Sequence, residues 1–520
     1  MQAHAATSGS LWHTATRIGA SALFVAALAA CGGGGGGGGI APPVTPPAPP
    51  APSPGLPASS TLAQQCAPTN TLAPAGNRNG SLDTEKRWVR SYMDEAYLWY
   101  REIPTVDPAL PQFSNTGNVT ASLDAYFSAL LTPARTQSGK LKDEFSFTFP
   151  TAEWNALSQG GTSAGFGIEW FLASPTPPRN LTVAYVDPNT PAAMANVTRG
   201  MRVVSINGVD IDTNTQAGIA TINEGAFSPR PGTSYNFVFR TLAGGTVNAT
   251  LTAGTVTKVP VQNVRVINTP TGAVGYLTFN DHIATAEGQL VTAFNQLRAA
   301  NVTDLVLDLR YNGGGFIYIA SQVGFMIAGS QATTGRTFER LRFNDKRVAD
   351  NNDPSNNIPF FGSTSGFQNS GTTANQPLPQ LGLPRVFILV TDNSCSASES
   401  IINGLRGIGV TVNLIGSTTC GKPFGFTAKD NCGISYFPIE FQGVNNQGFG
   451  DFADGFAPTC RVADDFSKPL GDSTEGMLAA ALALRANGAC PAPDVVQRQS
   501  MAAQSEGRLI RSIVRENKYR

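Results

Sequence analysis

Residues 32–58 cannot contribute to a packed core. Eight consecutive glycines run from Gly32 to Gly39, and a proline-rich stretch continues from residue 40 to residue 58. Glycine loses more conformational freedom on folding than other residues, and proline-rich chain is extended and semi-rigid. We therefore predict a tether, placed at residues 31–80, and expect the folded domains to follow it.

A short apolar run precedes the tether. Residues 18–30 are mostly apolar, follow Arg17 and are too few to span a bilayer, so we assign residues 1–30 to a signal peptide. The run ends in Leu28-Ala-Ala-Cys31, which resembles the bacterial lipobox and implies that Cys31 is lipidated. The alternative is an ordinary signal peptide in which Cys31 has no role. We expect a lipid-anchored protein of the bacterial cell envelope, and the glycine after Cys31 favours the outer membrane, facing the periplasm.

The histidine count limits the chemistry. The chain has three histidines, His4, His13 and His282, and the first two lie in the predicted signal peptide. One imidazole cannot build a multi-histidine zinc site, and a Ser-His-Asp triad would need His282. His282 follows a predicted strand, and we expect a structural or surface role for it.

Charge and cysteine content restrict partners and compartment. Lys plus Arg and Asp plus Glu both number 36, so no basic excess is present to neutralise the phosphates of nucleic acid. With Cys31 acylated, six cysteines remain, and an even number in an exported protein suggests disulfides. We expect Cys420–Cys432 and Cys460–Cys490, because each pair brackets a short segment.

The chain after the tether is long enough for several domains of roughly 100–200 residues. Residues 81–155 have a helical pattern that starts at a capping sequence, Ser81-Leu-Asp-Thr-Glu85, and resumes near residues 123–131. We expect a small N-terminal helical domain there, and it carries no evident chemistry.

Residues 160–256 have short strand patterns separated by glycine-rich turns. The order is a strand after Gly165-Phe166-Gly167-Ile168, a strand at 181–186, a short helix at 188–195 and a strand that ends in an Ile-Asn-Gly turn at 206–208. This order resembles a PDZ domain. The resemblance implies that Gly165, Phe166, Gly167 and Ile168 offer backbone N–H groups to a peptide carboxylate while the peptide adds as a strand.

Residues 259–490 have an α/β pattern. Buried strands are expected at 274–279, 305–309, 386–390 and 412–415, with helices at 287–300 and 398–406. Residues 329–380 are polar and rich in glycine, asparagine and serine, so we expect an insertion or long loop. Residues 491–520 are expected to form a basic tail, whose last 25 residues we interpret as a frayed helix.

Ser396 lies where a nucleophile is well placed. The sequence Cys395-Ser-Ala-Ser-Glu399 falls between a buried strand and a helix. A serine at such a turn is exposed at the sheet edge, and the next N–H lies in the positive field of the helix start. Helix capping explains the same pattern without catalysis.

Lys422 lies in Gly416-Ser-Thr-Thr-Cys-Gly-Lys-Pro423, which nearly matches a Walker A loop. Pro423 replaces the hydroxyl that would bind magnesium, so nucleotide binding is not expected. A lysine buried among Phe424, Phe426 and the sheet edge favours its neutral form and can act as a base, the role otherwise given to histidine.

A triple-glycine turn follows the strand at 305–309. The sequence Asp308-Leu-Arg-Tyr-Asn-Gly-Gly-Gly315 brings backbone N–H groups close to whatever lies above the strand end. It is either an ordinary tight turn or half of an oxyanion hole.

Together these motifs resemble the carboxyl-terminal processing peptidases (tail-specific proteases), which use a Ser-Lys pair. The family pattern Asp-Leu-Arg-x-Asn-x-Gly-Gly matches residues 308–315, Ser-Ala-Ser-Glu matches residues 396–399, and Thr-x-Gly-Lys matches residues 419–422. The resemblance covers roughly residues 160–470. It implies that Ser396 is the nucleophile, that Lys422 is the general base, and that the N–H groups of Ala397 and Gly315 or Gly314 form the oxyanion hole.

The resemblance also implies the fold class. We expect an α/β protein whose ββα core is similar to the crotonase and Clp peptidase folds, joined to the PDZ-like domain and the helical domain. Two departures from the family pattern are present. Phe426 stands where many members have a glutamine that orients the lysine, and the serine-to-lysine spacing is one residue longer than expected.

The sequence therefore predicts an exported serine endopeptidase that cuts the tails of partly unfolded proteins and needs no metal or organic cofactor. The membrane is its second partner, through Cys31, and neither nucleic acid nor nucleotide is expected to bind. The alternative is a catalytically inactive, lipid-anchored PDZ protein that binds peptides of the cell envelope.

Overall fold

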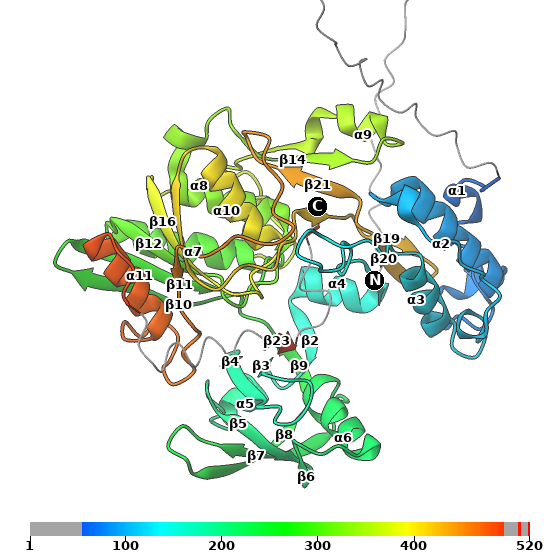
Figure 1. Ribbon diagram of the computed structural model, residues 1–520, viewed down its shortest axis with the longest axis horizontal. Coiled ribbons are helices and arrows are strands. Elements are labelled where there is room, and N and C mark those ends of the chain that lie inside the picture. Colours follow the sequence, from blue (N-terminus) through cyan, green and yellow to red (C-terminus); the bar gives the residue numbers. More distant parts are fainter. Residues whose placement is uncertain (1–54, 493–507, 511–517, 520) are drawn as a thin grey trace, which may run out of the picture. The chain divides into compact units, whose positions relative to one another are not determined.

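The computed structural model describes residues 55–492, 508–510 and 518–519 (Figure 1). The predicted signal peptide, Cys31 and the glycine run lie outside these residues, so the lipid anchor stays a prediction. Residue 56 begins the unit that contains the described domains. Within the described part of the chain, none of the helices combines the length and the hydropathy that a bilayer crossing requires.

The N-terminal helical domain begins earlier than expected. Helix α1 spans Ser59–Leu62, and Cys66 is disulfide-bonded to Cys432. The packed chain therefore starts well before residue 80, the expected end of the tether. Helix α2 (Leu82–Ala96) starts as predicted, because the Ser81 hydroxyl accepts a hydrogen bond from a backbone N–H of the first turn.

The same domain is joined to the core by strand pairing. Helix α3 (Val119–Ala129) begins four residues before the predicted segment, and α4 spans Thr151–Gly160. Between them, β1 (Phe147–Pro150) pairs antiparallel with β20 (Ile434–Phe437). The predicted helical region 81–155 therefore contains a strand directly before α4, which the helical pattern of the preceding residues did not indicate.

Residues 162–257 form a β-rich domain with the order of elements expected from the sequence. Its sheet contains β3 (Ile168–Leu172), β4 (Thr182–Val186), β5 (Arg202–Ile206), β7 (Ser234–Arg240) and β8 (Thr246–Thr252), in that order. Helices α5 (Pro191–Met194) and α6 (Gln216–Phe227) belong to it. Strands β2 (Thr162–Gly165) and β9 (Gly254–Thr257) pair with each other where the chain enters and leaves the domain.

The core contains a six-stranded sheet that is parallel except for its first strand. The order is β10 (Val261–Thr269), β11 (Gly272–Phe279), β12 (Asp304–Asp308), β16 (Arg385–Val390), β17 (Thr411–Gly416) and β22 (Cys460–Arg461). Helices α7 (Ala286–Ala299), α8 (Ile317–Thr333) and α10 (Ala397–Gly407) pack on one face, and α11 (Gly476–Asn487) packs on the other (Figure 1).

Alternation along the strands explains why both faces are covered. In β12, Leu305 and Leu307 pack with the helices of one face, and Val306 packs with α11 on the other. Successive side chains of a strand point to opposite faces, so a continuous apolar run predicts burial on both sides. The four buried strands expected from the sequence are all present in this sheet.

The expected insertion at 329–380 is only partly a loop. It contains β14 (Thr337–Phe343) and β15 (Asn357–Pro359), which form a second sheet with β21 (Phe441–Val444) and β18 (Phe424–Gly425). The polar composition hid β14, whose buried and exposed residues alternate in its second half. Helix α8, which starts directly after the glycine turn, was not expected either.

Three disulfides occur in the described residues. Cys460–Cys490 is confirmed, whereas the expected Cys420–Cys432 pair is wrong: Cys432 bonds to Cys66 and Cys420 bonds to Cys395. Sequence proximity favoured the wrong partner. The fold brings Cys395 and Cys420 together because β16 and β17 are neighbouring parallel strands, and the two cysteines follow their ends.

Two short strands lie near the end of the sequence, where a frayed helix was expected. Strand β23 (Arg508–Ile510) pairs with β3, and β24 (Lys518–Tyr519) pairs with β13 (Gly315–Phe316). The helical expectation is wrong for these residues.

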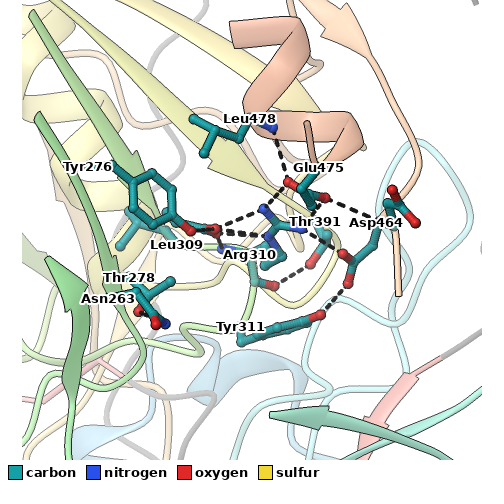
Figure 2. A network of polar contacts seen from close by, with 12 residues as sticks. Asn263, Tyr276, Thr278, Leu309, Arg310, Tyr311, Thr391, Asp464, Glu475 and Leu478 are labelled. Carbon is teal, nitrogen blue, oxygen red and sulfur yellow. Dashed lines mark hydrogen bonds and ion pairs between the residues drawn. The ribbon is translucent and has the colours of Figure 1, made fainter. Parts of the chain in front are cut away.

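A buried ionic network lies at the end of β12 (Figure 2). The Arg310 guanidinium donates hydrogen bonds to Asp308, Glu475 and Asp464, at 2.6–3.1 Å. All four groups are almost inaccessible to solvent. Burial lowers the pKa of Arg310 and the three carboxylates raise it, with a net rise, so the guanidinium stays charged.

We predict that Arg310→Met destabilises the protein by about 3–5 kcal/mol, because it leaves buried carboxylates without their counter-ion. Urea unfolding followed by circular dichroism measures this change. Arg101→Met is the matched control, since Arg101 pairs with Asp345 on an exposed surface and its loss leaves the unfolding midpoint nearly unchanged. Equal effects of the two substitutions would contradict a structural role of the buried network.

Candidate active site

Ser396 occupies a strained turn between β16 and α10. Its φ is 59° and its ψ is −113°, in the region that favours glycine. Such a conformation costs about 1–3 kcal/mol and persists only where the surroundings hold it. The residue is fully buried, and its hydroxyl has no hydrogen-bond partner among the described residues. The turn therefore holds an unengaged hydroxyl at the start of a helix.

Glu399 holds this turn against the lysine loop. Its Oε2 accepts hydrogen bonds from the backbone N–H groups of Ser396 and Lys422, at 2.9 and 2.8 Å. Its Oε1 accepts from the Thr419 hydroxyl at 2.6 Å and from the Gly421 N–H at 2.9 Å. Burial raises the pKa of Glu399, and these four hydrogen bonds oppose that rise. Because both oxygens act as acceptors, the ionised carboxylate fits the site.

Lys422 is fully buried between two aromatic rings. Its Nζ lies 4.8 Å from the ring centroid of Phe145 and 4.8 Å from that of Phe426. Ring faces attract an ammonium and exclude water. Phe426, which stands at the position of the family's glutamine, therefore contacts the lysine through its ring instead of through an amide.

The serine and lysine predicted from the sequence are brought together through their backbones. Their amide nitrogens donate to the same Glu399 oxygen, so they lie within the sum of two hydrogen-bond lengths of each other. The Cys395–Cys420 disulfide joins the same two turns, with the Cα atoms 5.2 Å apart. The Ser396 hydroxyl makes no hydrogen bond to Lys422 in this structure. Such contacts are often loose without substrate.

The glycine turn packs directly on the serine turn. Gly314 has a φ of 103°, and a Cβ added there would lie 2.8 Å from the Ser396 Cβ and 3.0 Å from the Ala397 nitrogen. Only glycine allows this approach. The Gly314 N–H donates to Oδ1 of Asn312 at 2.9 Å, so Gly315 is the better oxyanion donor of the two. Ala397 begins α10, where its N–H has no intrahelical acceptor.

His282 is buried beside the glycine turn and not at the surface. The backbone N–H of His282 donates to the Gly314 carbonyl at 3.1 Å, and the imidazole Nδ1 lies 2.9 Å from Oδ1 of Asn312. Burial lowers the pKa of His282 to about 3, so the imidazole is neutral at neutral pH. These contacts support the structural role expected from the sequence.

The predicted peptide-binding loop lies in the β-rich domain, between β2 and β3. Gly167 has a φ of 81°, and a Cβ there would lie 2.4 Å from Thr190, the N-cap of α5. Phe166 is buried, and its carbonyl accepts from the Ala192 N–H at 3.1 Å. The loop is therefore fixed by α5, with Gly165 and Ile168 at the ends of the flanking strands.

Arg199 connects the β-rich domain to the core, which the sequence did not indicate. It donates to Asp464 at 2.5 Å, to the Ala184 carbonyl at 2.7 Å and to the Tyr311 hydroxyl. Tyr311 also donates to Asp464 (Figure 2). It directly precedes Asn312 of the glycine turn. No local pattern marks Arg199, because its partners come from distant parts of the chain.

We predict that Glu399→Gln destabilises the protein, because an amide nitrogen cannot accept hydrogen bonds. Each donor left without an acceptor costs about 1–3 kcal/mol. Urea unfolding at neutral pH measures the loss. Glu144→Gln is the control at an exposed position, and it is expected to have little effect. A stability equal to that of the parent would show that Glu399 does not hold the two turns together.

Two family models match parts of this chain. Residues 273–430 match the model of peptidase family S41, and residues 84–147 match the model of the peptidase S41 N-terminal domain. The first match includes Ser396 and Lys422, and the second covers most of the N-terminal helical domain.

Relatives extend the similarity over most of the chain. A carboxyl-terminal-processing protease of Picosynechococcus is 24% identical over 346 residues, which cover 64% of this chain and 70% of that protein. The crystal structure of an S41 protease from Bacteroides fragilis has a TM-score of 0.58 and 24% identity, covering 77% of this chain and 97% of that one. A photosystem II D1 C-terminal processing protease aligns with a TM-score of 0.42 and 17% identity, over 76% of this chain and 99% of that one.

The solved S41 protease supports the fold, and the two family matches with the curated relative support the class of enzyme. The chain is a serine-type peptidase with an S41 domain at residues 273–430, and it is similar to the carboxyl-terminal processing proteases.

Proposed function

We propose that this chain is an exported endopeptidase that cleaves protein tails by a Ser-Lys mechanism, after a PDZ-like domain has captured the substrate. The observation that carries the proposal is the shared carboxylate of Glu399, which holds the backbones of Ser396 and Lys422 together beside the glycine turn. A buried serine hydroxyl without a partner is otherwise unfavourable, and enzymes keep such groups for chemistry.

In this mechanism the Ser396 oxygen attacks the scissile carbonyl carbon while the neutral amine of Lys422 takes the hydroxyl proton. The carbonyl electrons move to oxygen, and the N–H groups of Ala397 and Gly315 stabilise the resulting oxyanion. Collapse of this intermediate breaks the C–N bond, and Lys422 gives the proton to the leaving amine. Water then hydrolyses the acyl-enzyme by the same route, and no metal or organic cofactor takes part.

Capture by the β-rich domain is supported by the edge of its sheet. Strand β3 follows the Gly165–Ile168 loop and is the outermost strand of the domain's own sheet. An exposed strand edge can bind an extended peptide through backbone hydrogen bonds, the mode used by PDZ domains. Arg199 links this domain to Tyr311 beside the glycine turn, so that occupancy of the domain can influence the active site.

The proposal also includes the fold of the core and the location of the protein. The core resembles the crotonase and Clp peptidase folds in its repeated strand-helix units. We also propose that the protein lies in the bacterial cell envelope, anchored through Cys31 in the outer membrane and facing the periplasm. Its disulfides fit an oxidising compartment.

A second candidate function is peptide binding without catalysis. The missing hydrogen bond between Ser396 and Lys422, together with Phe426 at the position of the family's glutamine, favours it. In that case the β-rich domain would bind envelope proteins and the core would be an inactive scaffold.

We predict that Ser396→Ala and Lys422→Ala each lower kcat/KM by about a thousand-fold or more, because loss of either member of a nucleophile-base pair abolishes the pair. The protein would start at residue 56, without the lipid anchor. The substrate would be a loosely folded protein with an apolar C-terminal tail, and mass spectrometry would identify the products.

Ser330→Ala and Lys429→Ala are matched controls at exposed positions. Both are expected to keep the parent rate, and unchanged thermal unfolding of the two site variants would exclude misfolding. Binding of the tail without cleavage by the parent would favour the second candidate function.

A further inference from the structure

The edge of the β-rich domain is occupied by this chain's own C-terminal region. Strand β23 pairs antiparallel with β3, in the register Arg508 to Leu172, Leu509 to Phe171 and Ile510 to Trp170. It adds one strand to the outer side of the sheet, next to β3. An outer sheet edge is also the position at which a peptide ligand adds as a strand.

A second strand of the same region lies at the candidate active site. Strand β24 pairs parallel with β13, in the register Gly315 to Lys518 and Phe316 to Tyr519. Gly315 is the proposed oxyanion donor. Strand β24 also lies next to β18, which begins two residues after Lys422. The backbone at 518–519 is thus placed between the glycine turn and the lysine loop.

One continuous segment supplies both strands. Seven residues, 511–517, separate β23 from β24. Neither strand contains proline, and Ile510 and Tyr519 are of the β-branched and aromatic types that favour extended chain. A segment with this composition can act as a substrate strand at both edges.

We propose that strands β23 and β24 are intramolecular ligands of this peptidase, which occupy the capture edge β3 and the active-site strand β13 until a substrate tail displaces them. The inference rests on the proposed function, because it assumes that substrates use the same two edges. It also defines the substrate class: extended, proline-free tails with branched apolar and basic residues, like the segment that they replace.

The test uses the chain from residue 56 to residue 520, with prolines that remove backbone donors from the two strands. One variant carries Leu509→Pro and Ile510→Pro, and a second carries Lys518→Pro and Tyr519→Pro. The control carries Ala502→Pro and Ala503→Pro, outside both strands. Proline cannot donate to a ladder, so the strand variants lose the pairing.

The first readout is the kinetics of cleavage of a quenched, unstructured peptide. Both strand variants are expected to show a KM about tenfold below that of the parent and the control, the factor expected if the segment occupies the site about nine-tenths of the time. A synthetic peptide of residues 505–520 should restore the higher KM by competition. Equal KM values in all four proteins would overturn the proposal.

The second readout does not need activity. Hydrogen exchange is measured in the Ser396→Ala background, at residues 168–172 and 315–316. Faster exchange in the strand variants than in the control supports the proposal, whether or not any of the proteins cleaves a substrate. Absence of cleavage in every protein would refute the proposed function and not this proposal. Unchanged exchange at both edges would overturn the proposal while leaving the peptidase activity intact.

Discussion

The buried carboxylate of Glu399 is the interaction on which the site depends. Its two oxygens accept four hydrogen bonds from two turns that follow neighbouring strands of the sheet. A buried charge is costly unless it is fully hydrogen-bonded, so these contacts are needed for the carboxylate to be buried at all. In return they fix the positions of Ser396 and Lys422. The Cys395–Cys420 disulfide joins the same turns covalently, and the glycine turn closes the third side.

The buried Arg310 network also holds parts of the chain together, at the end of β12. It anchors the end of β12, from which the glycine turn starts, to α11 and to the loop that carries Asp464. Because Asp464 also binds Arg199 and Tyr311, the same carboxylate connects the β-rich domain to the turn that carries Asn312. The Asn312 Oδ1 accepts a hydrogen bond from the Gly314 N–H and lies within hydrogen-bond distance of the His282 Nδ1. The geometry of the glycine turn, which carries the proposed oxyanion donor, therefore depends on contacts with two other parts of the protein.

Local signals in the sequence were sufficient for the four buried strands of the core sheet and for the helix after Ser396, because apolar runs and capping residues act over short distances. They were insufficient where partners are distant in the chain. Cys66–Cys432 spans 366 residues, and no spacing rule predicts it. Strand β14 was hidden by a polar surrounding segment, and Arg199 has no motif. The contact of Lys422 with Phe145 could not be predicted from the sequence, because the two residues are distant in the chain. Phe426 was already identified as a departure from the family pattern.

The central claim is that Ser396 is a nucleophile activated by Lys422. The most direct test is covalent labelling with a fluorophosphonate, followed by peptide mapping. The account predicts one phosphonylated residue, Ser396, and strongly reduced labelling in Lys422→Ala with the fold unchanged. Labelling of another serine, or equal labelling with and without Lys422, would contradict it.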